Sequence, residues 1–307
     1  MPNYLPTNDL LFRKLFTSKD TNHILKAFVR DVLGEEFETL TPRDTYHIDS
    51  YKQSLEDENK LKYAEVDVLA ASNDGTQVTI EMQVRSHDFF RERAVFYLSA
   101  AYASPYGDED AEAYEDDNQF STLHAAYGIN IIDFHMFPKD EDALQNISYH
   151  NDKTRKPFLG SQGQKIHRIC FLSLKNKNIE QDSPAYHWQQ FFKTGQVAEQ
   201  APQYLKDAQN KVNYYSLNEE EKQMIMRVDK GRAIRNAELS TARREGLEEG
   251  RKEGKQEGRK EGKQEGKSEN KVETAINFLK MGLSPEQVAQ GTDLSIEQVK
   301  ELERQLE

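Results

Sequence analysis

The chain has 307 residues, enough for one large domain or two small ones, and 31% of them are charged, with a net charge of −12. This acidic balance argues against binding to nucleic acid through a general excess of positive charge, and no apolar run approaches the roughly 18 residues that a membrane-spanning helix needs, so we expect no membrane partner. The single cysteine, Cys170, excludes an internal disulfide and a cysteine-based zinc site, and the first residues lack a secretory pattern, so we expect a cytoplasmic protein.

Residues 1–226 are predicted to form a globular domain of mixed helices and strands. Apolar residues at spacings of three and four predict helices, and runs rich in β-branched residues predict strands. The predicted helices cover 8–16, 22–33 and 88–103, and the predicted strands cover 65–70, 77–83, 127–134 and 165–174. This order predicts an α/β fold with a mixed sheet flanked by helices.

The first two strands form a hairpin around Asn73-Asp74-Gly75, because Asp-Gly between β-rich runs favours a tight turn. Side chains alternate along a strand, so such a hairpin brings Asp67 near Glu81. Two neighbouring carboxylates repel each other unless a cation lies between them, and hard divalent ions such as Mg²⁺ bind carboxylate oxygens. The alternative is an amphipathic hairpin whose polar face is exposed to solvent and binds no cation.

The chain resembles the Rpn family of recombination-promoting nucleases, also described as transposases, within the PD-(D/E)XK nuclease superfamily. The residues that carry the resemblance are 8–16, Asp67-Val68, Asp74-Gly75, 80–83, 89–99 and 281–289. The resemblance implies a restriction-endonuclease-like core and a divalent-metal-dependent endonuclease that cuts double-stranded DNA and promotes recombination. The implied cofactor is Mg²⁺ or another divalent cation such as Ca²⁺ or Mn²⁺.

The family pattern also implies roles for single residues. Asp67 and Glu81 are the catalytic, metal-binding acids, and Gln83 occupies the position of the superfamily lysine. An amide orients water but takes no proton, so the general base stays unassigned. Asp9 is a further metal-ligand candidate, or alternatively a carboxylate that stabilises a helix start. The candidates for contact with DNA phosphate, whose alternative is a solvated or packed helix face, are Arg91, Arg93 and Tyr97.

Two features depart from the family pattern. An acidic insert occupies 108–117, and the strand at 165–174 lacks the acid expected near Ser173. These two departures concern the fit of the substrate. Gln83 and the acidic surface leave open a second function. The alternative is a catalytically inactive nuclease-fold module that binds DNA or a protein partner.

The tail differs in composition from the body. Residues 227–270 are predicted to be a charged helix or a flexible linker, with glycine at every fourth position from Gly246 to Gly266. Glycine weakens a helix, so this segment needs a packing partner or fluctuates. Residues 271–307 are predicted to form short helices resembling a helix-turn-helix, with capping boxes at Ser284 and Ser295. We expect the tail to join two chains into a homodimer, and the alternatives are that it contacts DNA or that its short helices only cap the chain.

Overall fold

The computed structural model describes residues 4–44, 66–111 and 113–306, apart from the side chains of 229 and 231–235. Glu65, where we predicted the hairpin to begin, and Glu112 of the acidic insert lie outside the described residues. The chain divides into two units, Met1–Arg227 and Val228–Glu307. Each unit has its own core and is described separately below.

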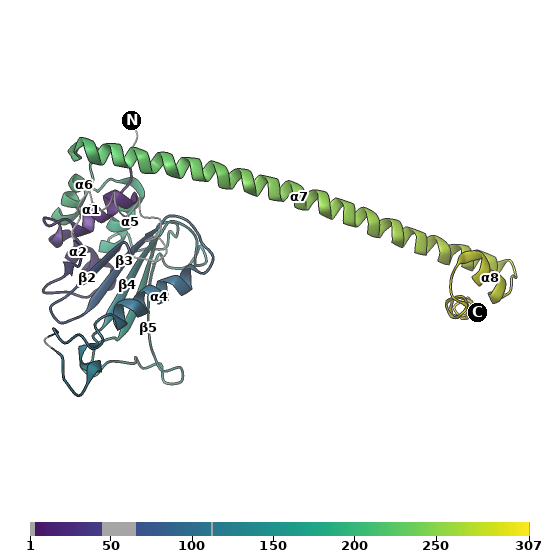
Figure 1. Ribbon diagram of the computed structural model, residues 1–307, viewed down its shortest axis with the longest axis horizontal. Helices are drawn as coiled ribbons and strands as arrows, with labels where there is room; N and C mark the ends of the chain where they lie inside the picture. The colour runs from purple at the N-terminus through teal and green to yellow at the C-terminus, as the bar shows by residue number, and fades with distance from the viewer. Residues whose placement is uncertain (1–3, 45–65, 112, 307) are drawn as a thin grey trace. The chain divides into compact units, whose positions relative to one another are not determined.

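The first unit is built on a six-stranded sheet of order β1-β2-β3-β4-β6-β5 (Figure 1). The strands are β1 Thr41–Pro42, β2 Val68–Ala71, β3 Gln77–Gln83, β4 Ala126–Ile132, β5 Leu144–Ser148 and β6 His167–Ser173. The central strands β3, β4 and β6 are parallel, whereas the other pairings are antiparallel. The predicted mixed sheet and α/β class are therefore confirmed.

Helices cover both faces of this sheet. On one face, α4 (Phe90–Ala103) packs against β3, β4 and β6. On the other lie α1 (Asp9–Thr17), α2 (Asn22–Leu33), α5 (Pro184–Thr194) and α6 (Gln203–Lys211). Two neighbouring residues of β6 point to opposite faces of the sheet. Phe171 packs in the hydrophobic cluster that contains α4, whereas the Cys170 thiol faces the Val32 carbonyl of α2. β4 is consequently buried along its whole length, as expected for a strand with both faces covered.

Local signals in the sequence fix the ends of the first helices. The Asn8 side chain caps α1 by accepting hydrogen bonds from the backbone amides of Leu10 and Leu11. Gly34 ends α2 in the left-handed conformation, with φ of 68°, which glycine adopts without strain. The N-terminal start of α1 is thereby held at the edge of the sheet that carries β2, with which α1 is in contact.

A buried carboxylate joins the helices of the second face. Asp31 of α2 accepts hydrogen bonds from the Trp188 indole, at 2.8 Å, and from the Tyr204 hydroxyl, at 2.7 Å. Trp188 lies among the fully buried aromatic rings of this layer, which are Phe12, Phe16, Phe28, Phe191 and Phe192. The aromatic core fixes how α1 and α2 pack, and so places the α1 residues that reach the sheet edge.

The second unit is helical, as predicted for the C-terminal region. α7 runs from Glu219 to Lys280, so its first residues belong to the first unit, where Met224 and Ile225 are buried. The helices α8 (Pro285–Thr292) and α9 (Ile296–Arg304) begin with the two predicted capping boxes. They pack on the end of α7 through Ala275, Val288 and Val299.

The tail glycines leave open space beside α7. A Cβ atom built at each of the six positions from Gly246 to Gly266 meets nothing within 4 Å. In the segments that the structure describes, no helix is both long and apolar enough to cross a membrane. The described tail is therefore a polar helix whose glycine stripe faces open space.

Candidate functional site

The hairpin pairing brings Asp67 and Glu81 together. Val68 is the register partner of Ile80, so the preceding residue, Asp67, lies opposite Glu81. The Met82 amide donates to Asp67 Oδ2 at 2.8 Å, and the Asp67 amide donates to Glu81 Oε2 at 3.3 Å. Each carboxylate is thus held by the backbone of the other strand.

Burial makes both carboxyl groups reluctant to ionise. Desolvation is the main cause that raises the pKa of Asp67 to about 6, and the negative charge of Asp9 acts in the same direction. The hydrogen bond from the Met82 amide and the charges of Arg13 and Arg93 oppose the rise. Desolvation raises the pKa of Glu81 to about 8, assisted by the charge of Asp67. The two acids repel each other when both are ionised, and a cation between them would relieve that repulsion.

The first helix contributes charge to this pair, as the sequence led us to expect. Asp9 stands in the first turn of α1, directly after the capping residue Asn8, and its charge acts on Asp67. Sequence reasoning missed Arg13, whose charge lowers the pKa of both carboxyl groups. Arg13 lies four residues after Asp9 and so on the same face of α1, which is the signal that identifies it.

Gln83 is buried, and both ends of its amide are engaged. Its Oε1 accepts a short hydrogen bond from Arg93 Nη2, and its Nε2 donates to the Arg85 carbonyl at 2.9 Å. In this arrangement Gln83 orients Arg93 and the loop that follows β3. Orientation of a water molecule by Gln83 stays a prediction, and the second N–H and the second lone pair of the amide are the groups that would serve it.

Arg93 and Tyr97 lie in the same cluster, whereas Arg91 points elsewhere. Arg93 Nη2 also donates to Glu81 Oε1 at 3.3 Å, and the Phe90 and Tyr97 rings lie 5.0 and 5.9 Å from its guanidinium carbon. Burial raises the pKa of Tyr97, and the charge of Glu81 adds to the effect. Arg91 instead donates to the Met136 carbonyl at 2.9 Å. A contact of Arg91 with DNA phosphate therefore stays a prediction outside this cluster.

A second charged pair at this end of the sheet escaped sequence reasoning. Asp133 follows β4 and donates its amide to the Gln83 carbonyl at 2.9 Å, and Lys175, beyond β6, lies 3.0 Å from its carboxylate. Asp133 directly follows the buried strand β4, and Lys175 stands two residues after β6, which is the signal that identifies them. Ser173 itself is buried and bonds Asn176, so the acid that we expected there is absent from this position.

The described acids suit a cation that needs few protein ligands. No group of three or more histidine, cysteine, aspartate or glutamate side chains in the described segments is arranged to hold a metal. Mg²⁺ keeps several waters and typically takes one or two carboxylates together with substrate phosphates. Asp67 and Glu81 fit this requirement, because they are adjacent and a bound cation would favour the ionised form that burial disfavours.

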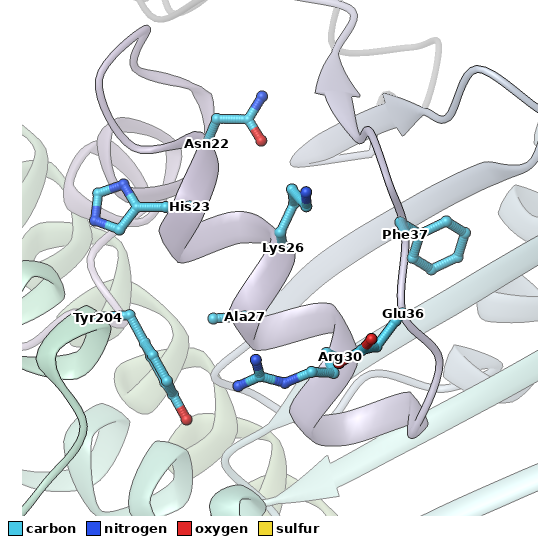
Figure 2. A pocket seen from close by; sticks show the side chains of 8 residues that line it. All are labelled: Asn22, His23, Lys26, Ala27, Arg30, Glu36, Phe37 and Tyr204. Atoms are coloured by element: carbon cyan, nitrogen blue, oxygen red, sulfur yellow. The ribbon is translucent and has the colours of Figure 1, made fainter.

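A pocket of about 630 Å³ lies apart from these residues, between α2, the following loop and α6 (Figure 2). Two of its cationic groups are already engaged, since Arg30 donates to Asp31 and Lys26 donates to the Glu38 carbonyl. None of the site residues predicted from the sequence lines this pocket. The predicted Asp67–Glu81 pair lies instead where β2 begins and β3 ends.

Comparison with known protein families gives a match over most of the chain. A family model described as PD-(D/E)XK nuclease family transposase matches residues 6–242, which is more than two thirds of the chain. No curated protein and no solved structure matches. The matched region contains every candidate site residue and the whole sheet.

Proposed function

Because the chain belongs to the PD-(D/E)XK nuclease family of transposases, we propose that it is a divalent-metal-dependent DNA endonuclease that promotes recombination. The family resemblance found in the sequence is thereby confirmed, and a nuclease of this family acts on DNA. The proposal of a metal-dependent endonuclease rests on the Asp67–Glu81 pair, two adjacent carboxyl groups whose pKa values are raised by burial.

Each residue of the cluster has a part in this proposal. Asp67 and Glu81 hold the cation, with Mg²⁺ as the first choice and Mn²⁺ or Ca²⁺ as alternatives, and Asp9 adds negative charge from α1. When bound, a divalent cation stabilises negative charge on phosphodiester oxygens and makes water a better nucleophile. Arg93 positions the Glu81 carboxylate, to which it donates a hydrogen bond.

Plasmid nicking tests this proposal. Purified protein is incubated with supercoiled plasmid in Mg²⁺, Mn²⁺, Ca²⁺ or EDTA, together with the variants Asp67→Asn and Glu81→Gln. Asp133→Asn is the matched control, since Asp133 lies near Gln83 but pairs with Lys175. We expect nicking by the wild type and the control in Mg²⁺, and none by the two site variants. Equal nicking by either site variant would refute the assignment of the site.

One observation favours a second candidate, a catalytically inactive nuclease-fold module that binds DNA or a protein partner. Gln83 stands where the superfamily has lysine, and both ends of its amide are engaged. Amides take no proton, so the cluster offers no evident base in that position. Tight DNA binding by the wild type without nicking in any of the three cations would favour this candidate.

The tail supports a proposal about assembly. The six glycines of α7 leave room for close approach of another helix, as small residues do at helix interfaces. We infer a homodimer joined through the tail, in which two active sites cut the two strands of a duplex. We further propose that the protein works in the cytoplasm, where its DNA substrate is accessible in a bacterial-type cell.

A further inference from the structure

Phe89 is an exposed aromatic residue in a strained backbone conformation. Its side chain is 78% exposed, and its φ of 61° and ψ of 26° lie in the left-handed region. A phenylalanine in this region is sterically disfavoured, and its exposed ring gains nothing from burial. Such strain persists only where the surroundings impose it, and it concentrates at functional sites.

The backbone of Phe89 is tied to the carboxylate cluster. Its carbonyl accepts a hydrogen bond from the Arg93 amide at 3.0 Å, which forms the first turn of α4. The next residue, Phe90, is buried, and its ring lies 5.0 Å from the Arg93 guanidinium. Arg93 in turn bonds Glu81 and Gln83. Phe89 therefore stands at the start of α4, four residues before Arg93, which contacts the proposed catalytic acid.

The loop before Phe89 is anchored to the same cluster. Gln83, at the end of β3, donates to the Arg85 carbonyl at 2.9 Å. Residues 86–89 are exposed, and within the described part of the chain no other ring contacts that of Phe89. The loop is thus held at both of its ends, while the Phe89 ring faces solvent.

Both signs of charge surround Phe89. Arg85 and Arg91 flank it in the sequence, as do the acids Asp88 and Glu92, and Arg91 bonds a backbone carbonyl, so that bond does not neutralise its charge. Positive groups interleaved with aromatic rings are the combination that binds single-stranded nucleic acid, because phosphates pair with the charges and bases stack on the rings.

We propose that Phe89 stacks on the face of an unpaired nucleobase of the DNA strand held at the Asp67–Glu81 pair. The proposal rests on the proposed function, since it needs DNA at these carboxylates. It assigns a substrate preference to the chain, which binds DNA with an exposed base next to the scissile phosphate, as at a gap, better than intact duplex. Stacking tolerates any base, so the preference is for structure and not for sequence.

Binding and crosslinking in EDTA test the proposal without relying on cleavage. Two duplexes are compared by fluorescence anisotropy, one fully paired and one with a single-nucleotide gap opposite 5-iodouracil. Irradiation then crosslinks the iodinated base to a stacked aromatic ring, and peptide mapping identifies the residue. The variants are Phe89→Leu, which keeps an apolar side chain, and Phe89→Tyr, which keeps an aromatic ring. Phe96→Leu is the matched control, because Phe96 lies on α4 and is 63% exposed.

We expect the crosslink to map to Phe89 and the wild type to prefer gapped DNA. Removal of one stacked base costs about 1–3 kcal/mol, so Phe89→Leu should weaken binding to gapped DNA by at least about fivefold. Phe89→Tyr and Phe96→Leu should bind as the wild type does. An equal loss in Phe96→Leu, unchanged binding by Phe89→Leu, or a wild type that does not bind gapped DNA would each overturn the proposal. A wild type that shows the Phe89 effect but never nicks plasmid would refute the nuclease proposal alone.

Discussion

Replacing Asp67 by asparagine should stabilise the metal-free protein at alkaline pH. The pKa of Asp67 is raised from 3.8 to about 6, and that of Glu81 from 4.5 to about 8. A raised pKa means that the folded state holds its proton more tightly than the unfolded state does. The stability that this provides is fully present below about pH 4 and is lost as the pH rises through the two folded-state values. At pH 8.5 Asp67 is ionised in the folded wild type, so the free energy of unfolding is reduced by the full effect of its raised pKa.

The expected gain follows from these values. A rise of the pKa of Asp67 from 3.8 to about 6 corresponds to about 3 kcal/mol of unfolding free energy. Asp67 is only half-buried, so solvent screening reduces the gain to about 2 kcal/mol. An asparagine Oδ1 still accepts the Met82 amide, so the hairpin keeps that bond. For a unit of 227 residues this is an increase in the melting temperature of about 4–8 °C.

Thermal unfolding followed by circular dichroism in EDTA measures this gain. Asp67→Asn and wild type are compared at pH 8.5 and pH 4, and the difference should shrink strongly at pH 4. Mg²⁺ should stabilise the wild type at pH 8.5 but not the variant, because a ligand stabilises only the state that binds it. Asp133→Asn, which breaks the 3.0 Å pair with Lys175, should lower the melting temperature slightly or leave it unchanged. A melting temperature of Asp67→Asn at or below that of wild type at pH 8.5 would show that the carboxylate pair is not repulsive.

Three further predictions concern other parts of the chain. Glu81→Gln should reduce Mg²⁺-dependent nicking by at least about 100-fold, since it removes a charge from the cation site while keeping the side-chain shape; retained nicking in a time course would contradict this. Phe89→Gly should raise the melting temperature, because it removes about 1–2 kcal/mol of left-handed strain and loses little burial; a lowered value would mean that the ring packs in the free protein. A chain truncated after residue 242 should remain folded, since Met224 and Ile225 are already buried in the first unit, but light scattering after gel filtration should show a monomer; an unchanged oligomeric mass would refute dimerisation through the tail.

The hairpin is the part of the site that the sequence predicted best. Alternation and the Asp74-Gly75 turn depend on neighbouring residues, so the pairing of Asp67 with Glu81 follows from local information. The strand order β3-β4-β6 depends on long-range packing that one sequence does not specify. The edge strands β1 and β5 were missed, since β1 has two residues and β5 has no buried residue that would mark a strand facing the core.

The helices, too, depend on long-range packing that the sequence alone does not specify. Sequence reasoning missed α5, although Ser183 and Pro184 give a clear start signal, and it missed α6. It placed Arg91 and Arg93 in one class of phosphate-binding candidates. The packing of α4 on the sheet separates them, because Arg93 faces Glu81 and Arg91 faces the loop after β4. Such a distinction depends on the rotation of α4, which spacing alone does not determine.

The two features at the site that weaken the free protein point to the same kind of ligand. Ionised carboxylates at Asp67 and Glu81 repel each other, and Phe89 holds an exposed ring in a strained conformation. A bound cation relieves the repulsion between the two carboxylates. A nucleobase can stack on the exposed Phe89 ring. A module that binds only a protein partner gains nothing from a buried pair of like charges. A site for a cation and an unpaired DNA base gains from both features, and this favours a site that binds DNA over a module that binds only a protein partner.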